Sequence, residues 1–256
     1  MKTQRILTTA AALAGAWVAT TSVSHARGAD APREAMVTAN NLSRLRVGGG
    51  AERLARELQG TDGSGAATVD ARNYFGYAGL DLLRWLTVFG GGGQVEAKVG
   101  GAEASYGDSD TSWMVGGTAT LLAHPITEPG YLAGTLRIDA QYLHWDFEAG
   151  MGDGTLQWTE DRVAVIASVE FPVFHAIDDS ENVPYSSVLS IGPVYSAIDG
   201  DAPGGRSGGR TELEEVDTMG LLAGFDMKFA ANWSAGWQGR WIGDEVSHTF
   251  TAAFHF

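Results

Sequence analysis

The chain has 256 residues, among them 35 glycines and 7 prolines, no cysteine, and a formal net charge of −14. So acidic a chain is unsuited to nucleic acid, whose phosphates are contacted by Lys and Arg, and we expect no nucleic-acid partner. Without cysteine, an exported domain cannot rely on disulfides. Abundant glycine with little proline favours a curved sheet over a disordered chain.

The N-terminal residues have the features of an export signal. Lys2 and Arg5 precede an apolar run over residues 6–18, and Ser24-His25-Ala26 provides a small-x-small cleavage site. This order of charge, apolar run and small residues is typical of a signal peptide. The run is shorter than the roughly 20 apolar residues that a spanning helix needs. We therefore predict a cleaved signal peptide over residues 1–26 and not a membrane anchor.

Alternation of apolar and polar residues recurs along the rest of the chain, between clusters of Gly, Asp, Ser and Pro. The C-terminal residues 246–256 carry apolar or aromatic residues at most even positions and small or polar ones at odd positions. Repeated alternating segments of this length are typical of membrane-spanning barrel strands. The pattern predicts ten strands, near residues 44–58, 69–82, 86–99, 111–123, 131–149, 155–173, 185–198, 213–230, 233–241 and 246–256.

These segments predict an all-β fold: a transmembrane antiparallel up-and-down β-barrel of about ten strands over residues 44–256. Eight strands are possible if two early segments do not span the membrane. An even number places both ends on the periplasmic side, with residues 27–43 as a periplasmic arm or small plug. The link at 174–184 is then long for a periplasmic turn, and that at 243–245 is short for an outer loop. The polar residues 199–210 are expected in an outer loop.

The last residues, Phe250-Thr-Ala-Ala-Phe254-His-Phe256, put aromatic rings at alternate positions and end in Phe. With the export signal and the alternating segments, this pattern resembles the small bacterial outer-membrane barrels of the OmpA and OmpX group. The resemblance implies that Phe250, Phe254 and Phe256 form an assembly signal for the barrel assembly machinery, with periplasmic chaperones as further transient partners. It also implies a place in the outer membrane of a Gram-negative-type bacterium, in contact with its lipid and lipopolysaccharide.

Aromatic residues near the predicted strand ends suggest two girdles at the membrane surfaces. The predicted girdle residues are Trp113, Tyr131, Tyr185, Tyr195, Phe229, Trp233 and Trp241. Two further rim residues, Trp145 and Trp158, fall on the inward parity of their strands. Either a bulge near the rim or aromatic side chains that point inward would account for them.

The predicted inward faces carry five acidic and five basic residues. Unpaired charges inside a narrow barrel would cost several kcal/mol each, so equal numbers indicate a mutually neutralised network. A barrel of this size has room for side chains and little else, which favours a filled lumen over an ion path. The predicted network comprises Glu96, Lys98, Arg137, Asp139, Glu160, Arg162, Glu170, Asp226, Lys228 and Arg240.

The remaining acidic residues, among them Asp199, Glu214 and Glu215, are expected in a solvated outer surface. Their oxygens could alternatively bind divalent cations that bridge to lipid phosphate, but no dense ligand spacing is present. We therefore predict no metal site and no cofactor.

One constellation invites an enzymatic interpretation. His144 and Asp146, with Asp108 and Asp110, resemble the His–Asp and acidic pairs at the lip of omptin-type proteases. The order His-Trp-Asp departs from that family, and the two pairs lie on neighbouring links instead of opposite ones. No phosphate loop, His-Glu-x-x-His or Gly-x-Ser-x-Gly motif is present.

The sequence thus predicts a non-enzymatic outer-membrane barrel without catalytic residues, with a structural or surface-interaction role, a filled lumen and acidic outer loops. The alternatives are a small pore for ions or solutes, an omptin-like lip-site protease, and a soluble periplasmic barrel.

Overall fold

The computed structural model describes residues 45–61, 66–83, 85–100, 105–127, 133–151, 154–172, 184–203, 210–229 and 233–256. The predicted signal peptide and the predicted arm, residues 1–26 and 27–43, lie outside the described residues. Within these ranges, no helix has the length and apolar character needed to cross a membrane.

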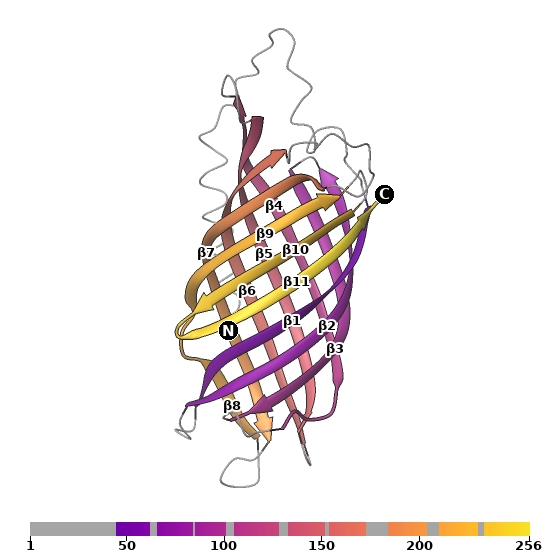
Figure 1. Cartoon of the computed structure of the whole chain (residues 1–256). Helices are drawn as coiled ribbons and strands as arrows, with labels where there is room; N and C mark the ends of the chain where they lie inside the picture. Colours follow the sequence, from indigo (N-terminus) through magenta and orange to yellow (C-terminus); the bar gives the residue numbers. More distant parts are fainter. Residues whose placement is uncertain are drawn as a thin grey trace. The chain divides into compact units, whose positions relative to one another are not determined.

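The described strands form one antiparallel sheet (Figure 1). Their bounds are β1 Leu45–Gly60, β2 Ala66–Leu83, β3 Leu86–Val99, β4 Asp110–Thr127, β5 Ala133–Met151, β6 Gly154–Pro172, β7 Pro184–Pro203, β8 Arg210–Glu215, β9 Met219–Phe229, β10 Trp233–Ile242 and β11 Glu245–His255. All except β8 follow one another around the ring in chain order.

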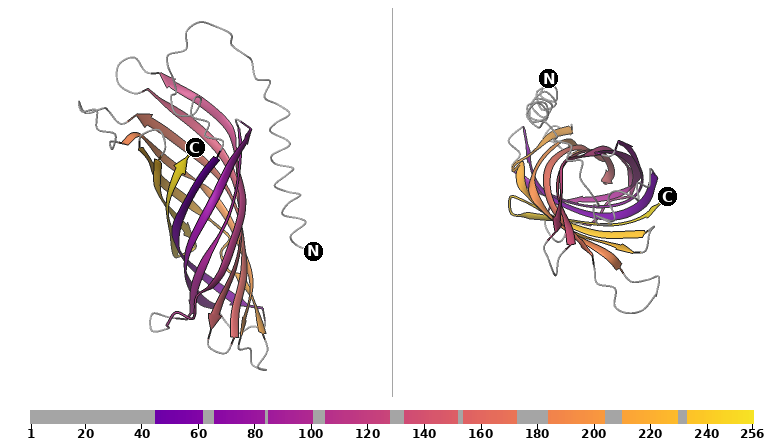
Figure 2. Two further views of the ribbon diagram at one scale, coloured as in Figure 1. Left: turned by 90° about the vertical axis from the view of Figure 1, so that its right-hand side faces the viewer. Right: turned by 90° about the horizontal axis from the view of Figure 1, so that it is seen from above.

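The ring closes because β11 pairs with β1, from Arg46 opposite His255 to Arg53 opposite His248. Viewed along its axis, the sheet encircles a lumen (Figure 2). The fold is therefore all-β, a closed antiparallel barrel of ten strands, which confirms the predicted architecture and strand number. We call the end that carries Leu45 and Phe256 the terminal rim, and the opposite end the distal rim.

The short strand β8 is absent from the sequence prediction, which treated residues 213–230 as one strand. Leu213 of β8 pairs on one side with Gly60 of β1 and on the other with Gly200 of β7. Strand β8 thus takes the place of β9, β10 and β11 in the distal part of the ring (Figure 1). Residues 199–203, expected in a loop, instead extend β7 to meet it.

The substitution of β8 for three strands explains the short link at 243–245. Ile242 and Glu245 pair across a two-residue turn, in which Gly243 has a φ of +57° that favours glycine. A Cβ atom at Gly243 would also lie within 2.3 Å of the Asp217 carboxylate. The turn therefore packs against the chain between β8 and β9 and does not extend the distal rim as a loop.

Glycines that face the lumen make room for aromatic rings from the adjacent strand. A Cβ atom on Gly50 would lie 2.7 Å from the Phe75 ring, and one on Gly116 would lie 2.7 Å from the Phe89 ring. Each ring thus lies against bare backbone. Outward glycines differ: around Gly76, only a backbone oxygen lies within 4 Å of the Cβ position.

This contrast predicts opposite effects for the same substitution on the two faces. Gly116→Val should destabilise the barrel by roughly 1–3 kcal/mol, because the added side chain overlaps the Phe89 ring. Gly76→Val adds the same atoms to an open outward surface and should leave stability almost unchanged. Urea unfolding of the refolded protein in detergent, followed by Trp fluorescence, would measure both. Equal midpoints for the two variants would contradict the ring-on-glycine packing.

Candidate functional site: the barrel wall and its lumen

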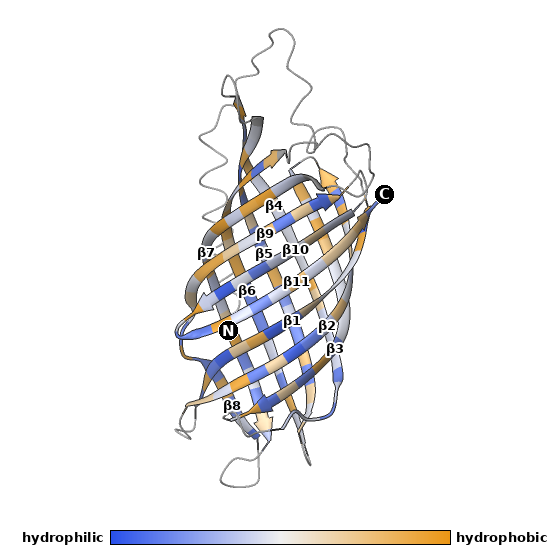
Figure 3. Cartoon of the chain, viewed as in Figure 1, coloured by the Kyte–Doolittle hydropathy of each residue, from blue (hydrophilic) through white to orange (hydrophobic). Residues whose placement is uncertain are grey.

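The outer surface of the wall has two zones. On β6, the outward side chains from Phe171 to Val163 are all apolar, and the next ones towards the distal rim are Asp161, Thr159 and Gln157. The apolar stretch on β6 measures about 20 Å along the axis of a barrel with tilted strands. We call this apolar zone the belt, and Figure 3 shows the underlying banding of hydropathy along the strands.

The belt ends at one level on neighbouring strands. Tyr142, Val163 and Tyr195 form a continuous row across β5, β6 and β7. One step towards the distal rim, His144 lies opposite Asp161. The boundary is therefore a property of the wall and not of a single strand.

The predicted girdle residues occupy the outward face wherever the structure describes them. Trp113, Trp233 and Trp241 are exposed, and Tyr195 and Phe229 are partly exposed on the same face. Tyr131 and the side chain of Tyr185 lie outside the described residues. Of the predicted assembly signal, Phe250 and Phe256 are exposed, and Phe254 packs edge-on against Trp233 and Phe256.

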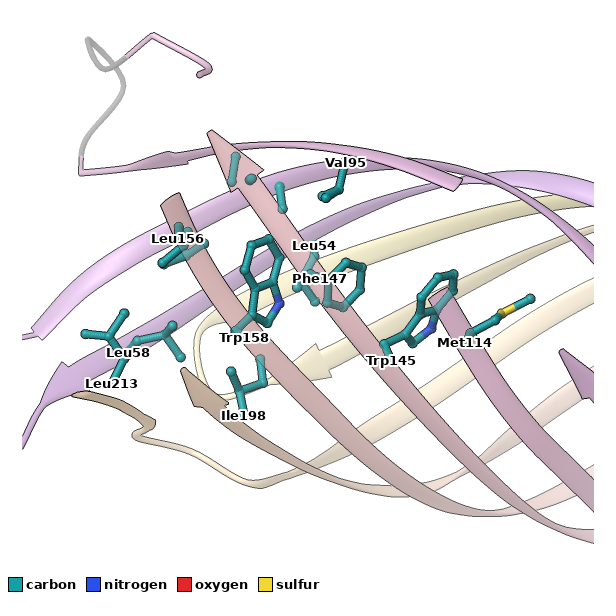
Figure 4. Packing of buried hydrophobic residues seen from close by; sticks show 14 of the residues in the cluster. Leu54, Leu58, Val95, Met114, Trp145, Phe147, Leu156, Trp158, Ile198 and Leu213 are labelled. Atoms are coloured by element: carbon teal, nitrogen blue, oxygen red, sulfur yellow. The ribbon is translucent and has the colours of Figure 1, made fainter. Parts of the chain in front are cut away.

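The distal half of the lumen is filled with apolar side chains (Figure 4). The rings of Trp145, Phe147 and Trp158 stack in series, with centroids 5.1 Å and 4.7 Å apart. Around them lie buried aliphatic residues from β1, β6, β7 and β8, among them Leu58 and Leu213. Of the two explanations for Trp145 and Trp158, the structure thus shows inward-pointing rim aromatics.

A buried ionic network lies next to this apolar core, on the side towards the terminal rim. The Glu160 carboxylate is fully buried and accepts hydrogen bonds from Arg162 at 2.8 Å, Arg240 at 3.0 Å and Ser196 at 3.1 Å. Arg162 and Arg240 also pair with Glu52. Two residues on one strand, Glu160 and Arg162, are thus linked to the neighbouring strand β7 and, across the lumen, to β1 and β10.

The network includes three residues that the sequence prediction missed. Arg56 lies 3.9 Å from Glu160 and 3.0 Å from Glu215, and it donates a 2.6 Å hydrogen bond to Ser247. Glu52 and Arg56 share the inward face of β1 with Leu54, a parity that could have identified them. Glu215 could not be identified so, because its place depends on β8. Three arginines and three glutamates therefore balance one another.

Beyond a second, small apolar cluster that includes Ala164, the lumen nearer the terminal rim carries polar and charged side chains. Lys228 and Ser186 both contact Glu170, at 3.0 Å, and Asp226 is on the inward face beside Lys228. Arg137 and Asp139 form a 3.1 Å ion pair that Thr120 also contacts. A further inward pair, Arg46 with Asp81 at 3.2 Å, was not predicted. Charges in this half are paired locally and do not converge on one centre.

Glu96 and Lys98 are exceptions, because they face outward and not into the lumen. Their neighbours Val95 and Ala97 are fully buried in the distal core. The prediction placed both of these charges inside, whereas here the interior is apolar and the outside polar. Lys98 instead lies 3.9 Å from Asp70 on the outer surface.

The His–Asp arrangement also differs from the sequence expectation. His144 Nδ1 lies 2.9 Å from Asp161 and not beside Asp146, and the Tyr142 hydroxyl donates to the same carboxylate at 2.7 Å. This group lies on the outer wall at the edge of the belt, next to the Trp113 ring. In the described part of the chain, no three His, Asp or Glu residues are grouped to hold a metal ion.

Comparisons with known proteins add distant structural similarities. No protein-family model matches the chain, and no curated protein matches it in sequence. The transport unit of the autotransporter AIDA-I from Escherichia coli aligns over 83% of this chain and 89% of its own, with 11% identity and a TM-score of 0.41. The translocator domain of NalP from Neisseria meningitidis aligns over 86% and 91%, with 12% identity and a TM-score of 0.35.

The ionic network makes Glu160 a sensitive position. Glu160→Gln removes the charge that three arginines share, and it should lower the free energy of unfolding by roughly 3–5 kcal/mol, because buried cations are left uncompensated. Asp199→Asn, the same change at an exposed site, should have an effect within about 0.5 kcal/mol. Urea unfolding in detergent would compare them. A Glu160→Gln protein as stable as wild type would show that the network is not a structural requirement.

Proposed function

We propose that this chain is an integral barrel of a Gram-negative-type outer membrane, with a sealed lumen and a structural or surface-interaction role. The terminal rim would face the periplasm, because an even number of strands brings both ends of the barrel to one side. The distal part, with its acidic outer surface, would project into the external medium.

The observation that carries this proposal is a reversal of polarity along the barrel axis. In the terminal half, the belt is apolar outside, and the lumen carries paired charges beyond one small apolar cluster, as in a barrel surrounded by hydrocarbon. In the distal half, the outside carries residues such as Asp161 and Glu148, and the inside carries Trp145 and Leu156, as in a water-soluble domain. A wholly soluble barrel would be expected to shield Leu189 and Ile191 from water, whereas each is more than half exposed here.

The belt makes extraction from membranes a direct test. The protein should remain in the membrane pellet after washing with alkaline carbonate and should require detergent to be released, because hydrocarbon covers the belt. A lumen-facing double variant, Ser168→Ala with Ser190→Ala, provides a control that leaves the outer surface unchanged. Release of the wild type in carbonate without detergent would support the soluble periplasmic alternative and overturn the membrane proposal.

The filling of the lumen distinguishes a sealed barrel from a small pore, because only a pore would conduct ions. The aromatic stack and the balanced ionic network occupy the distal half, so purified protein in planar bilayers should show no stable single-channel steps. Removal of the stack in the triple variant Trp145→Ala, Phe147→Ala, Trp158→Ala should introduce conductance where the protein still inserts. Regular conductance steps in the wild type would favour the pore.

The assembly machinery, periplasmic chaperones and lipopolysaccharide are proposed partners. The exposed Phe256 at the end of β11 supports recognition of the C-terminus, since within the described barrel its ring packs against one other aromatic ring, that of Phe254. Phe256→Ala should therefore reduce the fraction of folded barrel in the outer membrane several-fold, with a smaller effect on refolding into detergent. Heat-modifiable migration on gels would measure both, and equal losses in cells and in detergent would point to stability instead of recognition.

A further inference from the structure

A hollow of about 410 Å³ opens on the outer wall, where β10, β11, β1 and β2 reach the distal edge of the belt. Ala51 lies at its centre, between Phe250 on β11 and Tyr74 on β2. Trp237 of β10 lies beside Phe250. A small residue between three large rings leaves a groove that no side chain of the described barrel fills.

Two arginines lie at the distal end of this groove. Arg53 of β1 lies directly opposite Arg72 of β2, and opposite His248 on its other side. Like charges directly opposite each other on a sheet repel, so an anion beside the two guanidinium groups would stabilise this arrangement. The Asp70 carboxylate is one such anion and lies 2.8 Å from Arg53, yet the Arg53 side chain remains 59% exposed.

Arg72 is the less satisfied of the two. Its guanidinium carbon lies 4.2 Å from the centre of the Tyr106 ring, and although Glu96 lies opposite it on β3, no ion pair joins Arg72 to a carboxylate of the described residues. The His248 side chain adds a buried Nδ1 atom that has no hydrogen-bond partner in the described chain. Three nitrogen-bearing side chains in one row therefore retain capacity to bind a negatively charged group.

Towards the terminal rim, the groove continues as a smooth strip. Gly49 lies opposite Ala252 on one side and Gly76 on the other, and Gly76 lies opposite Gly92. These glycines face outward, and within 4 Å of their Cβ positions there are only backbone oxygens. No ring packs over them, in contrast with the inward glycines, so the strip offers apolar surface to a molecule outside the barrel.

We propose that this groove binds a phosphorylated membrane lipid, with its phosphate on Arg53 and Arg72 and an acyl chain along Ala51 and the glycine strip. The inference rests on the proposed place of the belt in a membrane. The arginines then lie at headgroup depth, since the belt ends at their row, and the rings of Trp237 and Tyr74 flank the chain. Arginine binds phosphate oxygens in a bidentate manner, which suits an exposed pair of guanidinium groups.

Native mass spectrometry of the full-length mature protein in neutral detergent would test this site. The probes are dioleoyl phosphatidic acid and, with the same chains but no phosphate, dioleoylglycerol. Phosphatidic acid should bind at least tenfold more tightly than dioleoylglycerol. The double variant Arg53→Gln, Arg72→Gln should remove that preference, and Arg210→Gln, which removes an exposed arginine at the start of β8, should preserve it.

A second variant tests the hollow without changing charge. Ala51→Leu fills the floor of the groove with a side chain that suits the belt, so folding should be kept while phosphatidic acid binding falls at least tenfold. Equal binding of both lipids, or equal loss in Arg210→Gln, would overturn the proposal. Displacement of the lipid by millimolar inorganic phosphate would also overturn it, in favour of a free-anion site. Any of these results in a protein that resists carbonate extraction would leave the membrane placement intact.

Discussion

The structure depends on one constraint: a single continuous wall separates different surroundings in its two halves. Along β6, the outward side chains from Phe171 to Val163 are apolar, and the inward ones are apolar at Trp158 and Leu156 and again at Ala164 and Ile166. The strand does not change its pleat between them. What changes is the outward face, which is apolar in the belt and polar in the distal half, the pattern of a strand whose belt meets hydrocarbon as we propose.

The ionic network lies where these two regimes meet. Glu160 and Arg162 follow the last inward aromatic residue of β6, and Arg162 is next in sequence to Val163 at the edge of the belt. Because these charges neutralise one another, they can be buried between the distal apolar core and the smaller apolar cluster that includes Ala164.

This reversal also explains which features the sequence could reveal. Alternation predicts that strands exist, and in the belt it assigns their faces correctly, so that Asp139, Glu170 and Arg240 lie inside as expected. In the distal half, the same rule, which places charged residues inside and apolar residues outside, gives the wrong face for Glu96 and Lys98. It also leaves the inward position of Trp145 unexplained. A pattern of period two cannot by itself say which face meets which medium. Only contacts between distant strands settle that.

The strand β8 shows the other limit of local pattern. Its six residues alternate like their neighbours, and nothing in them indicates that Leu213 pairs with both Gly60 and Gly200, which is a consequence of the ring as a whole. Once β8 bridges β1 and β7, Glu215 is brought to Arg56 and joins the network instead of a solvated loop. The same bridge allows β10 and β11 to end early, at the edge of the belt. Their outward residues Trp237, His248 and Phe250 thereby lie at the distal edge of the belt, beside the arginines of β1 and β2, so β8 also fixes the level of the groove on the outer wall.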